Sequence, residues 1–337
     1  MRVLLTGVPG WLGNRFLEVL VKGADGASAP NDWQIRCFVL QGSDISWINK
    51  LDPRIECVAG DLVTNQGLPE ALRGVDVVFH IAGIIHPRKI SELYQLNEHG
   101  TRNILQAAAS AGVRRLIYIS SNSVAGVNQN RELLMKEEDV PRPYLNYGLS
   151  KYRAEQAVRE FQQSGKIETV SLRPCWFYGP NQPPRQTTFF KMIQKGNPLI
   201  FGDGSNLRSM SYLDNVCQAM ILAAQSSRAN GQTYWIADRR PYTMNEIYQT
   251  VAELLDVKVF RPRRLPGLIS EACLLADRGL QRLGRYVKEV HVAGEMNKNI
   301  ACSIEKAVNE LGYNPRIELK EGMRRSIEWC RNNGMEI

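Results

Sequence analysis

The chain has 337 residues, 44% hydrophobic and 23% charged, which predicts one large domain or two modest ones with an ample core. A formal net charge of +8 suits an anionic ligand, and because the basic residues are scattered rather than clustered, nucleic acid is disfavoured as a partner. The seven cysteines form no C-x-x-C pair, which indicates reduced thiols in a cytoplasmic protein without a metal site, and no apolar run is long enough to span a bilayer.

The first residues predict a strand, a glycine-rich turn and a helix. The strand covers Val3–Thr6, and the helix runs over about residues 14–22. In a Rossmann unit this arrangement holds a pyrophosphate at the turn and the helix N-terminus. Gly7 would make the tight turn, Gly10 would let backbone approach the pyrophosphate, and Gly13 would let helix and strand pack closely.

The end of the second predicted strand bears on the choice of cofactor. This strand covers residues 35–40 and is followed by Gln41, Gly42 and Ser43, with neither an acidic nor a basic residue at its tip; Asp44 lies a little late. A cation there would hold the 2′-phosphate of NADP. Its absence favours NAD, while NADP stays open.

Two further strands are expected at residues 55–58 and 75–82. Asp61 follows the first, where its carboxylate is placed either to accept from an adenine amino group or to cap a helix. The second is nearly all apolar, as a strand covered on both faces should be. Its His80 is expected to pack within the fold, whereas His86, just beyond, is expected to face a substrate.

A fifth strand at residues 115–119 ends in a cluster of hydroxyl side chains. Ser120, Ser121 and Ser123 follow it directly, at the carboxyl end of a parallel strand, where ligands bind in such sheets. Without other evidence, such a cluster equally well begins a loop. Asn97, early in the preceding helix, is expected to hydrogen-bond main chain inside the fold.

Tyr147 and Lys151 are four residues apart in a predicted helix, so their side chains lie on one face, about one turn apart. A phenol has an ordinary pKa of roughly 10, and a neighbouring ammonium group lowers that pKa. The pair is therefore suited to proton transfer, although the same spacing also occurs on ordinary solvated helices.

Five segments, in this order and at these separations, resemble the extended short-chain dehydrogenase/reductases, and the NAD-dependent epimerase/dehydratase family most closely. They are Thr6-Gly7-x-x-Gly10-x-x-Gly13, Gly60-Asp61-Leu62, His80-Ile81-Ala82-Gly83, Ser120-Ser121 and Tyr147-x-x-x-Lys151. The resemblance implies an α/β fold, a Rossmann doubly wound parallel sheet with a smaller C-terminal α/β substrate domain. The Rossmann domain is expected over residues 1–175 with return segments near 208–240, and the mainly substrate-binding domain over 176–337.

The resemblance also implies roles for individual residues. Tyr147 is the acid/base, Lys151 holds the nicotinamide ribose and lowers the tyrosine pKa, and Ser121 hydrogen-bonds the reacting oxygen. Substrate contacts are expected from His86, Ser123, Trp176 and Arg208. Cofactor contacts are expected from Gly7, Gly10, Trp11, Leu12, Gly13, Leu40, Asp61, Leu62, Ile81, Ala82, Gly83, Tyr147, Lys151 and Pro174.

The second half carries two opposing indications of substrate. Residues 201–215 resemble the segment of nucleotide-sugar enzymes in which an arginine, here Arg208, pairs with a phosphate. This favours an NAD(P)-dependent oxidoreductase or epimerase that transfers hydride at a carbinol or keto carbon of a sugar nucleotide, with C4 as the expected position. Trp176, however, stands where many nucleotide-sugar epimerases have Asn, and Val124-Ala125-Gly126 resembles the 3β-hydroxysteroid dehydrogenase branch. An apolar alcohol or isoprenoid is therefore the alternative, and a cofactor-binding sensor without turnover is a third.

Residues 261–290 contain an apolar stripe at helical spacing among several arginines. Leu268, Ala272, Leu275 and Leu283 form the stripe. A lid or a packed core helix is preferred over a helix on a membrane surface. The resemblance further implies a homodimer that pairs through residues 91–111 and 144–163.

Overall fold

The computed structural model describes residues 1–337, except for the side chain of Arg185. Seven strands form one parallel sheet in the order β11-β6-β5-β4-β1-β2-β3. The strand order reverses between β1 and β4, so the ligand crevice of the sheet lies outside the carboxyl ends of these strands. The predicted doubly wound fold is confirmed. The strands are β1 (Arg2–Thr6), β2 (Gln34–Leu40), β3 (Glu56–Gly60), β4 (Val77–His80), β5 (Arg115–Ile119), β6 (Glu168–Pro174) and β11 (Thr233–Ile236).

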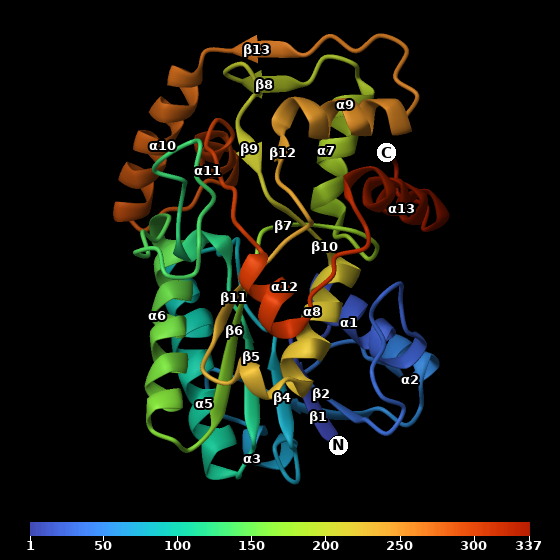
Figure 1. Ribbon diagram of the computed structural model, residues 1–337, viewed down its shortest axis with the longest axis vertical. Coiled ribbons are helices and arrows are strands. Elements are labelled where there is room, and N and C mark those ends of the chain that lie inside the picture. Colours follow the sequence, from blue (N-terminus) through green and yellow to red (C-terminus); the bar gives the residue numbers. More distant parts are fainter.

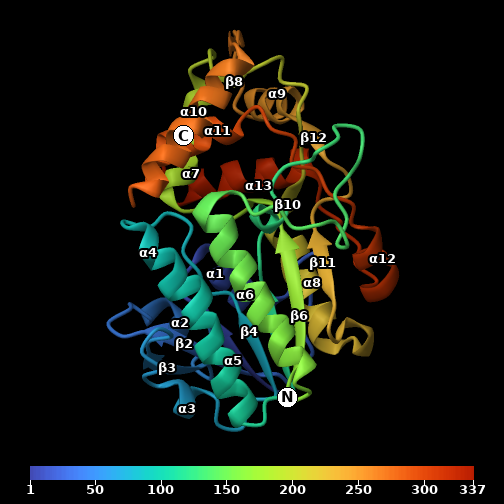
Figure 2. The same cartoon turned by 90° about the vertical axis from the view of Figure 1, so that its left-hand side faces the viewer.

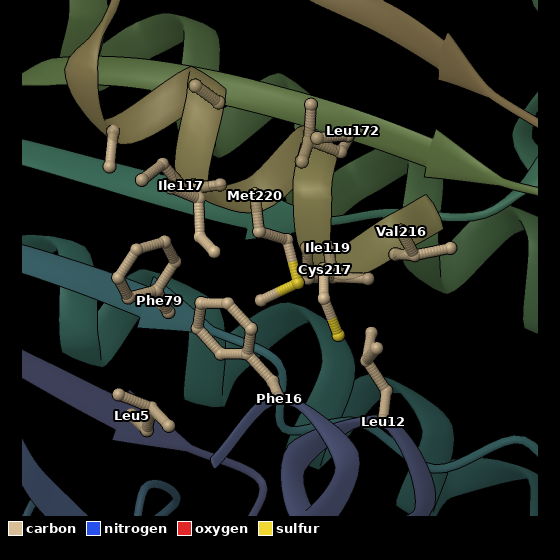
Figure 3. Packing of buried hydrophobic residues seen from close by; sticks show 14 of the residues in the cluster. Leu5, Leu12, Phe16, Phe79, Ile117, Ile119, Leu172, Val216, Cys217 and Met220 are labelled. Carbon is tan, nitrogen blue, oxygen red and sulfur yellow. The ribbon is translucent and has the colours of Figure 1, made fainter. Parts of the chain in front are cut away.

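Helices cover both faces of this sheet (Figure 1). Alternate residues of a strand point to opposite faces, so Leu5 packs with one layer of helices and Leu4 with the other. On the first face Phe16 packs edge-on against Phe79, with 4.7 Å between the ring centroids (Figure 3). The first layer contains α1 (Trp11–Lys22), α2 (Ser46–Leu51), α8 (Leu213–Gln225) and α12 (Glu305–Leu311); the second contains α3 (Leu68–Ala71), α5 (Thr101–Ser110) and α6 (Leu145–Gln163).

Two elements differ from the expectation. Helix α1 begins at Trp11 rather than near residue 14, because Gly10 is extended and serves as the N-cap, which brings the first helical turn directly onto the glycine turn. The helix that carries Asn97 is interrupted by a π-helical stretch, Tyr94–Gly100, between α4 (Ile90–Leu93) and α5. Wide turns of this kind occur frequently at functional sites.

A smaller unit lies beyond the carboxyl ends of the sheet (Figures 1 and 2). Its core joins three helices, α7 (Pro184–Gln194), α9 (Met244–Leu254) and α13 (Leu319–Asn332). Three short strand pairs support it: β7 (Trp176–Tyr178) with β10 (Met210–Tyr212), β9 (Leu207–Arg208) with β12 (Tyr242–Thr243), and β8 (Leu199–Phe201) with β13 (Arg263–Leu265). Two further helices, α10 (Gly267–Arg282) and α11 (Lys288–Glu295), pack on each other beside the start of α6. Among the described residues no helix is long and apolar enough to cross a bilayer.

Candidate active site

Tyr147 and Ser121 meet at the carboxyl end of the sheet. Tyr147 lies in the first turn of α6, and Ser121 lies two residues after the end of β5, where it caps a short 3₁₀ turn (Asn122–Val124). Burial raises the pKa of Tyr147 to about 12; a hydrogen bond with Ser121 opposes this rise, and the charge of Glu295 adds to it. The Ser121 hydroxyl also accepts a hydrogen bond from the Ser123 amide at 3.2 Å, which fixes its position. The site therefore brings together a phenol and a hydroxyl that interact with each other.

Lys151 lies one helical turn further along α6 and is 4% exposed, so its amino group is enclosed. Its Nζ donates to the Ile119 carbonyl oxygen at 2.7 Å and lies 4.3 Å from the centroid of the Tyr118 ring. Burial lowers the pKa of Lys151 to about 7, while the Glu155 carboxylate favours the charged form. Gly83 faces this amino group, since a Cβ on Gly83 would lie 3.7 Å from Nζ.

A buried ion pair supports the helix beneath Lys151. The Glu155 carboxylate receives two hydrogen bonds from Arg173, at 2.8 and 2.7 Å, and one from the Ser120 hydroxyl at 2.6 Å. Arg173 lies on β6, so these contacts tie α6 to the sheet at the level of the site. The Glu155 carboxylate is also the negative charge nearest in sequence to Lys151 on the same face of α6.

Asn97 and His80 have the structural roles expected of them. Asn97 exchanges two hydrogen bonds with the main chain of Ile84, at 2.8 and 2.9 Å, and donates to the Ser150 hydroxyl at 3.0 Å. His80 is fully buried, and its two ring nitrogens lie 2.9 Å from the hydroxyls of Thr6 and Thr101. Burial lowers the pKa of His80 to about 3, so this ring stays neutral and packs within the sheet.

The glycine turn fits a dinucleotide phosphate group. Gly7 has a φ of 83°, and a Cβ there would lie 2.7 Å from the Ala82 amide nitrogen, so the close approach of β1 and β4 requires glycine. No side chain caps the N-terminus of α1. The first amides of this helix, from Trp11, Leu12 and Gly13, are therefore oriented to bind an anion.

Other predicted cofactor residues lie around the same crevice. Leu40, at the end of β2, is 62% exposed and offers an apolar surface for a flat ring. Asp61 accepts from the Val63 amide at 2.6 Å through one carboxylate oxygen, so it already caps a turn. The Trp11 indole nitrogen donates to the Pro180 carbonyl oxygen at 2.7 Å, which connects the glycine turn to the smaller unit. Taken together, these residues fit a nicotinamide dinucleotide.

The four residues that were predicted to contact substrate lie in four different surroundings. The Ser123 hydroxyl lies 3.3 Å from that of Ser121, directly at the site. His86 lies 2.7 Å from the hydroxyl of Tyr286, which precedes α11. Trp176 packs edge-on against Phe189, 5.6 Å between centroids, in an aromatic cluster of the smaller unit.

Arg208, the fourth, is 7% exposed. One of its terminal nitrogens donates to the Glu295 carbonyl oxygen, and its Nε has no hydrogen-bond partner among the described residues. Tyr144 lies close enough for its hydroxyl to interact electrostatically with Arg208, and this hydroxyl too is buried without a partner in the described structure. Two unsatisfied polar atoms in one place are costly unless a ligand or water completes them.

Sequence reasoning missed three residues of the site. Glu155 lies four residues after Lys151, so helical spacing places it on the same face of α6 as the predicted pair, whereas Tyr144 is the extended residue directly before the helix. Glu295 comes from α11, and its charge raises the pKa of Tyr147. No local pattern connects α11 to this site, because only the fold of the smaller unit brings it there.

A cavity of about 870 Å³ adjoins the site. It lies between the start of α6 and α10, and the Tyr144 ring forms part of its wall. Its lining combines leucines with cations, including Leu145, Leu149, Leu274, Leu275, Arg142, Arg278, Arg282 and Lys298. The cavity is therefore suited to a molecule with an apolar part and an anionic part.

Helix α10 is attached next to the predicted acid/base. The Gln281 side-chain oxygen accepts two hydrogen bonds from Asn146, at 3.2 and 2.8 Å, immediately before Tyr147. Asp277, on the same helix, holds His291 of α11 at 2.7 Å. Burial alone lowers the pKa of His291, but the hydrogen bond and charge of Asp277, with the charge of Glu295, raise it above its ordinary value.

The comparisons with known proteins agree with this geometry. The model of the 3-beta hydroxysteroid dehydrogenase/isomerase family matches residues 4–266. "Uncharacterized protein y4nL" of Sinorhizobium fredii is 44% identical over 346 residues, which cover 99% of this chain and 96% of that protein. A 4-hydroxy-2-methyl-3-oxo-4-farnesyl-3,4-dihydroquinoline-1-oxide ketoreductase of Stigmatella aurantiaca is 27% identical over 333 residues, 96% and 95% of the two chains.

Among solved structures, DesIV, a dTDP-glucose 4,6-dehydratase from Streptomyces venezuelae with NAD and TYD bound, superposes with a TM-score of 0.78. Its sequence identity is 24%, and the match covers 99% of this chain and 98% of that one. At this identity the likeness shows the fold.

A Rossmann sheet with a Ser-Tyr-Lys set at its carboxyl end defines an enzyme of the extended short-chain dehydrogenase/reductase type, as predicted. More specifically, the chain belongs to the 3-beta hydroxysteroid dehydrogenase/isomerase family.

Proposed function

We propose that the protein is an NAD-dependent oxidoreductase that transfers hydride at a carbinol or keto carbon. The observation that carries this proposal is the convergence of Ser121 and Tyr147, which are close enough for the serine to lower the pKa of the phenol, one helical turn from the enclosed amino group of Lys151. NAD, when bound, supplies the acceptor or donor of the hydride. The glycine turn, the N-terminus of α1 and Lys151 hold it.

Each side chain of the site has a distinct task. As the phenolate, Tyr147 takes the hydroxyl proton of the substrate during oxidation; as the phenol, it gives a proton to the oxygen during reduction. Ser121 orients that oxygen by a hydrogen bond. Lys151 in its charged form lowers the pKa of the phenol, because a positive charge stabilises the phenolate. A cofactor-binding sensor without turnover would not require this arrangement.

For the substrate we propose a nucleotide sugar that reacts at C4. The buried Arg208, with its Nε unsatisfied beside the unsatisfied Tyr144 hydroxyl, supports an anionic group at this point. An arginine fork suits a diphosphate because it donates two parallel hydrogen bonds. Nucleotide-sugar chemistry is also the activity in the name of the structurally similar DesIV.

The second candidate is an apolar alcohol or ketone, such as a 3β-hydroxysteroid or an isoprenoid compound. The leucines that line the cavity beside Tyr144 favour it, as does Trp176 within an aromatic cluster. The name of the Stigmatella relative, a ketoreductase of a farnesylated quinoline, points the same way.

Ligand-induced thermal shift distinguishes these candidates. A ligand that binds only the folded state raises its stability by RT ln(1 + [L]/Kd). NAD, NADP, UDP and UDP-sugars are tested singly, and the nucleotides again with cofactor present. A UDP-dependent shift added to the NAD shift supports the nucleotide sugar. An NAD shift with no response to UDP or UDP-sugars, together with a shift by an apolar alcohol, supports the second candidate.

We also propose a homodimer that pairs through the helical face formed by α5 and α6. Molar mass from light scattering tests it, and a monomeric mass at micromolar concentration would contradict it.

A further inference from the structure

Helix α10 buries its polar side and exposes its apolar side, the reverse of an ordinary amphipathic helix packed on a core. Its inward side, Ser270, Leu274, Asp277 and Gln281, is mainly polar and buried. Its outward side carries the apolar stripe Leu268, Ala272, Leu275, Gly279 and Leu283. The three leucines of this stripe are 79%, 66% and 77% exposed, so of the two placements preferred from the sequence, a lid or a packed core helix, packing of the stripe in the core is wrong.

The polar side stays buried because its groups find partners. The Ser270 hydroxyl donates to the Ala293 carbonyl oxygen at 2.7 Å, Asp277 holds His291, and Gln281 holds Asn146. These contacts fix the rotation of α10, so the leucines point outward in the folded protein. In Figures 1 and 2, α10 runs along the outer edge of the smaller unit. Large exposed leucines on a helix fixed in this way mark a contact surface.

The charge around the stripe selects the partner. Arg278, Arg282 and Arg285 are exposed, and none of them forms a direct ion pair with the described residues, although the charge of Arg278 acts on Glu271. The carboxylates of α10 are neutralised, because Glu271 pairs with Lys298 and Asp277 pairs with His291. An isologous contact through this stripe would bring the arginines of both copies into one interface, with no uncompensated carboxylate of α10 to meet them. Leucines flanked by unpaired arginines instead complement an apolar layer beneath anionic headgroups.

We propose that α10 docks the protein onto an anionic lipid surface. Leu268, Leu275 and Leu283 enter the headgroup boundary, and the arginines contact lipid phosphates. Leu275 also lines the 870 Å³ cavity beside Tyr144. Docking therefore places this cavity next to the headgroup layer. Binding to the lipid surface does not depend on which substrate the enzyme takes.

The test is flotation of the purified full-length protein with vesicles. One set is phosphatidylcholine alone, and the other is an equimolar mixture of phosphatidylcholine and phosphatidylglycerol. We expect the wild type to float with the mixed vesicles and release at high salt. The double variant Leu268→Ser/Leu283→Ser should lower the partition coefficient at least about tenfold, since each leucine loses its apolar transfer. Arg282→Gln/Arg285→Gln should lower it about tenfold on mixed vesicles only.

A matched control changes an apolar residue and an arginine far from α10. Val308→Ser/Arg73→Gln should leave the partition coefficient unchanged, since Val308 lies on α12 and Arg73 lies beside the sheet before β4. Circular dichroism and thermal melting confirm that each variant is folded. The proposal would be overturned if the wild type did not bind mixed vesicles. It would also be overturned if the control variant lost as much of its partition coefficient as the α10 variants. A change from dimer to monomer in the leucine variant, without loss of vesicle binding, would assign the stripe to a second copy instead.

Discussion

Glu155 and Arg173 form a two-point ion pair, with bonds of 2.8 and 2.7 Å, in which both side chains are 1% exposed. The pair joins the helix of Tyr147 and Lys151 to strand β6. It thus connects the position of the proposed acid/base to the rigid sheet. Breaking one partner leaves an uncompensated buried charge, which is far more costly than replacing both partners.

Glu155→Gln should therefore destabilise the protein by about 3–5 kcal/mol, because Arg173 keeps its charge without a counterion. The double variant Glu155→Gln/Arg173→Met should recover a large part of this loss. Urea unfolding measures the free energies. A loss below about 1 kcal/mol in the single variant would show that the pair does not hold α6 in place.

Lys151 predicts a pH dependence of stability. The pKa of a lysine side chain in water is 10.5, and burial lowers the pKa of Lys151 in the folded protein to about 7, because it disfavours the charged amino group. Between these values the unfolded chain binds a proton that the folded chain lacks, so this residue makes stability rise with pH. Lys151→Met removes the effect. The stability of the wild type relative to this variant should increase by up to about 1.4 kcal/mol per pH unit from about pH 7 to pH 10.

The measurement is urea unfolding of both proteins across this range. A stability difference that does not change with pH would mean that Lys151 keeps its ordinary pKa in the fold.

Arg208→Ala should weaken binding of a nucleotide sugar about 10- to 100-fold, the effect of losing hydrogen bonds from a charged group, while NAD affinity stays the same. Calorimetric titration measures both affinities. Arg115→Ala is the matched control, since Arg115 is an equally buried arginine that donates to main-chain carbonyls of α8 and Ser226, at the other end of β5. Unchanged sugar-nucleotide affinity in Arg208→Ala would remove the phosphate role.

Asp277→Asn should lower the pKa of His291, because the carboxylate that favours the imidazolium is lost. The chain has four histidines, so imidazole signals can be assigned by single substitutions and followed by NMR titration. A folded pKa above the unfolded one stabilises the protein below the unfolded pKa of 6.5, and this gain is lost as pH rises through the folded pKa. The Asp277→Asn penalty should therefore be larger in mildly acidic than in mildly alkaline solution. An unaltered titration of His291 would contradict the pairing.

Much of the fold could be predicted from the sequence alone, because the patterns that indicate it are local. The nearly continuous apolar strands, the glycines at 7, 10 and 13, and the spacing of Tyr147 and Lys151 each depend on neighbours along the chain. The resemblance then implied that these strands form a doubly wound parallel sheet. The roles expected for His80 and Asn97 likewise followed from their places in the strand and helix.

Features that depend on distant contacts were not predictable. Glu295 reaches the neighbourhood of Tyr147 only through the packing of α11 on α10. The outward rotation of α10 could not be predicted, because a leucine stripe normally faces the core. Here the polar residues of the helix have specific buried partners, Ala293, His291 and Asn146, that periodicity does not reveal.

The most direct test of the proposed chemistry compares the wild type with Tyr147→Phe. NAD affinity is measured by calorimetry, and turnover by the NADH formed with nucleotide sugars and apolar alcohols. The account predicts that the variant binds NAD as the wild type does and loses about 10²–10⁴-fold in turnover, the usual contribution of a general acid/base. Turnover retained in Tyr147→Phe, or a wild type that does not bind NAD, would contradict it.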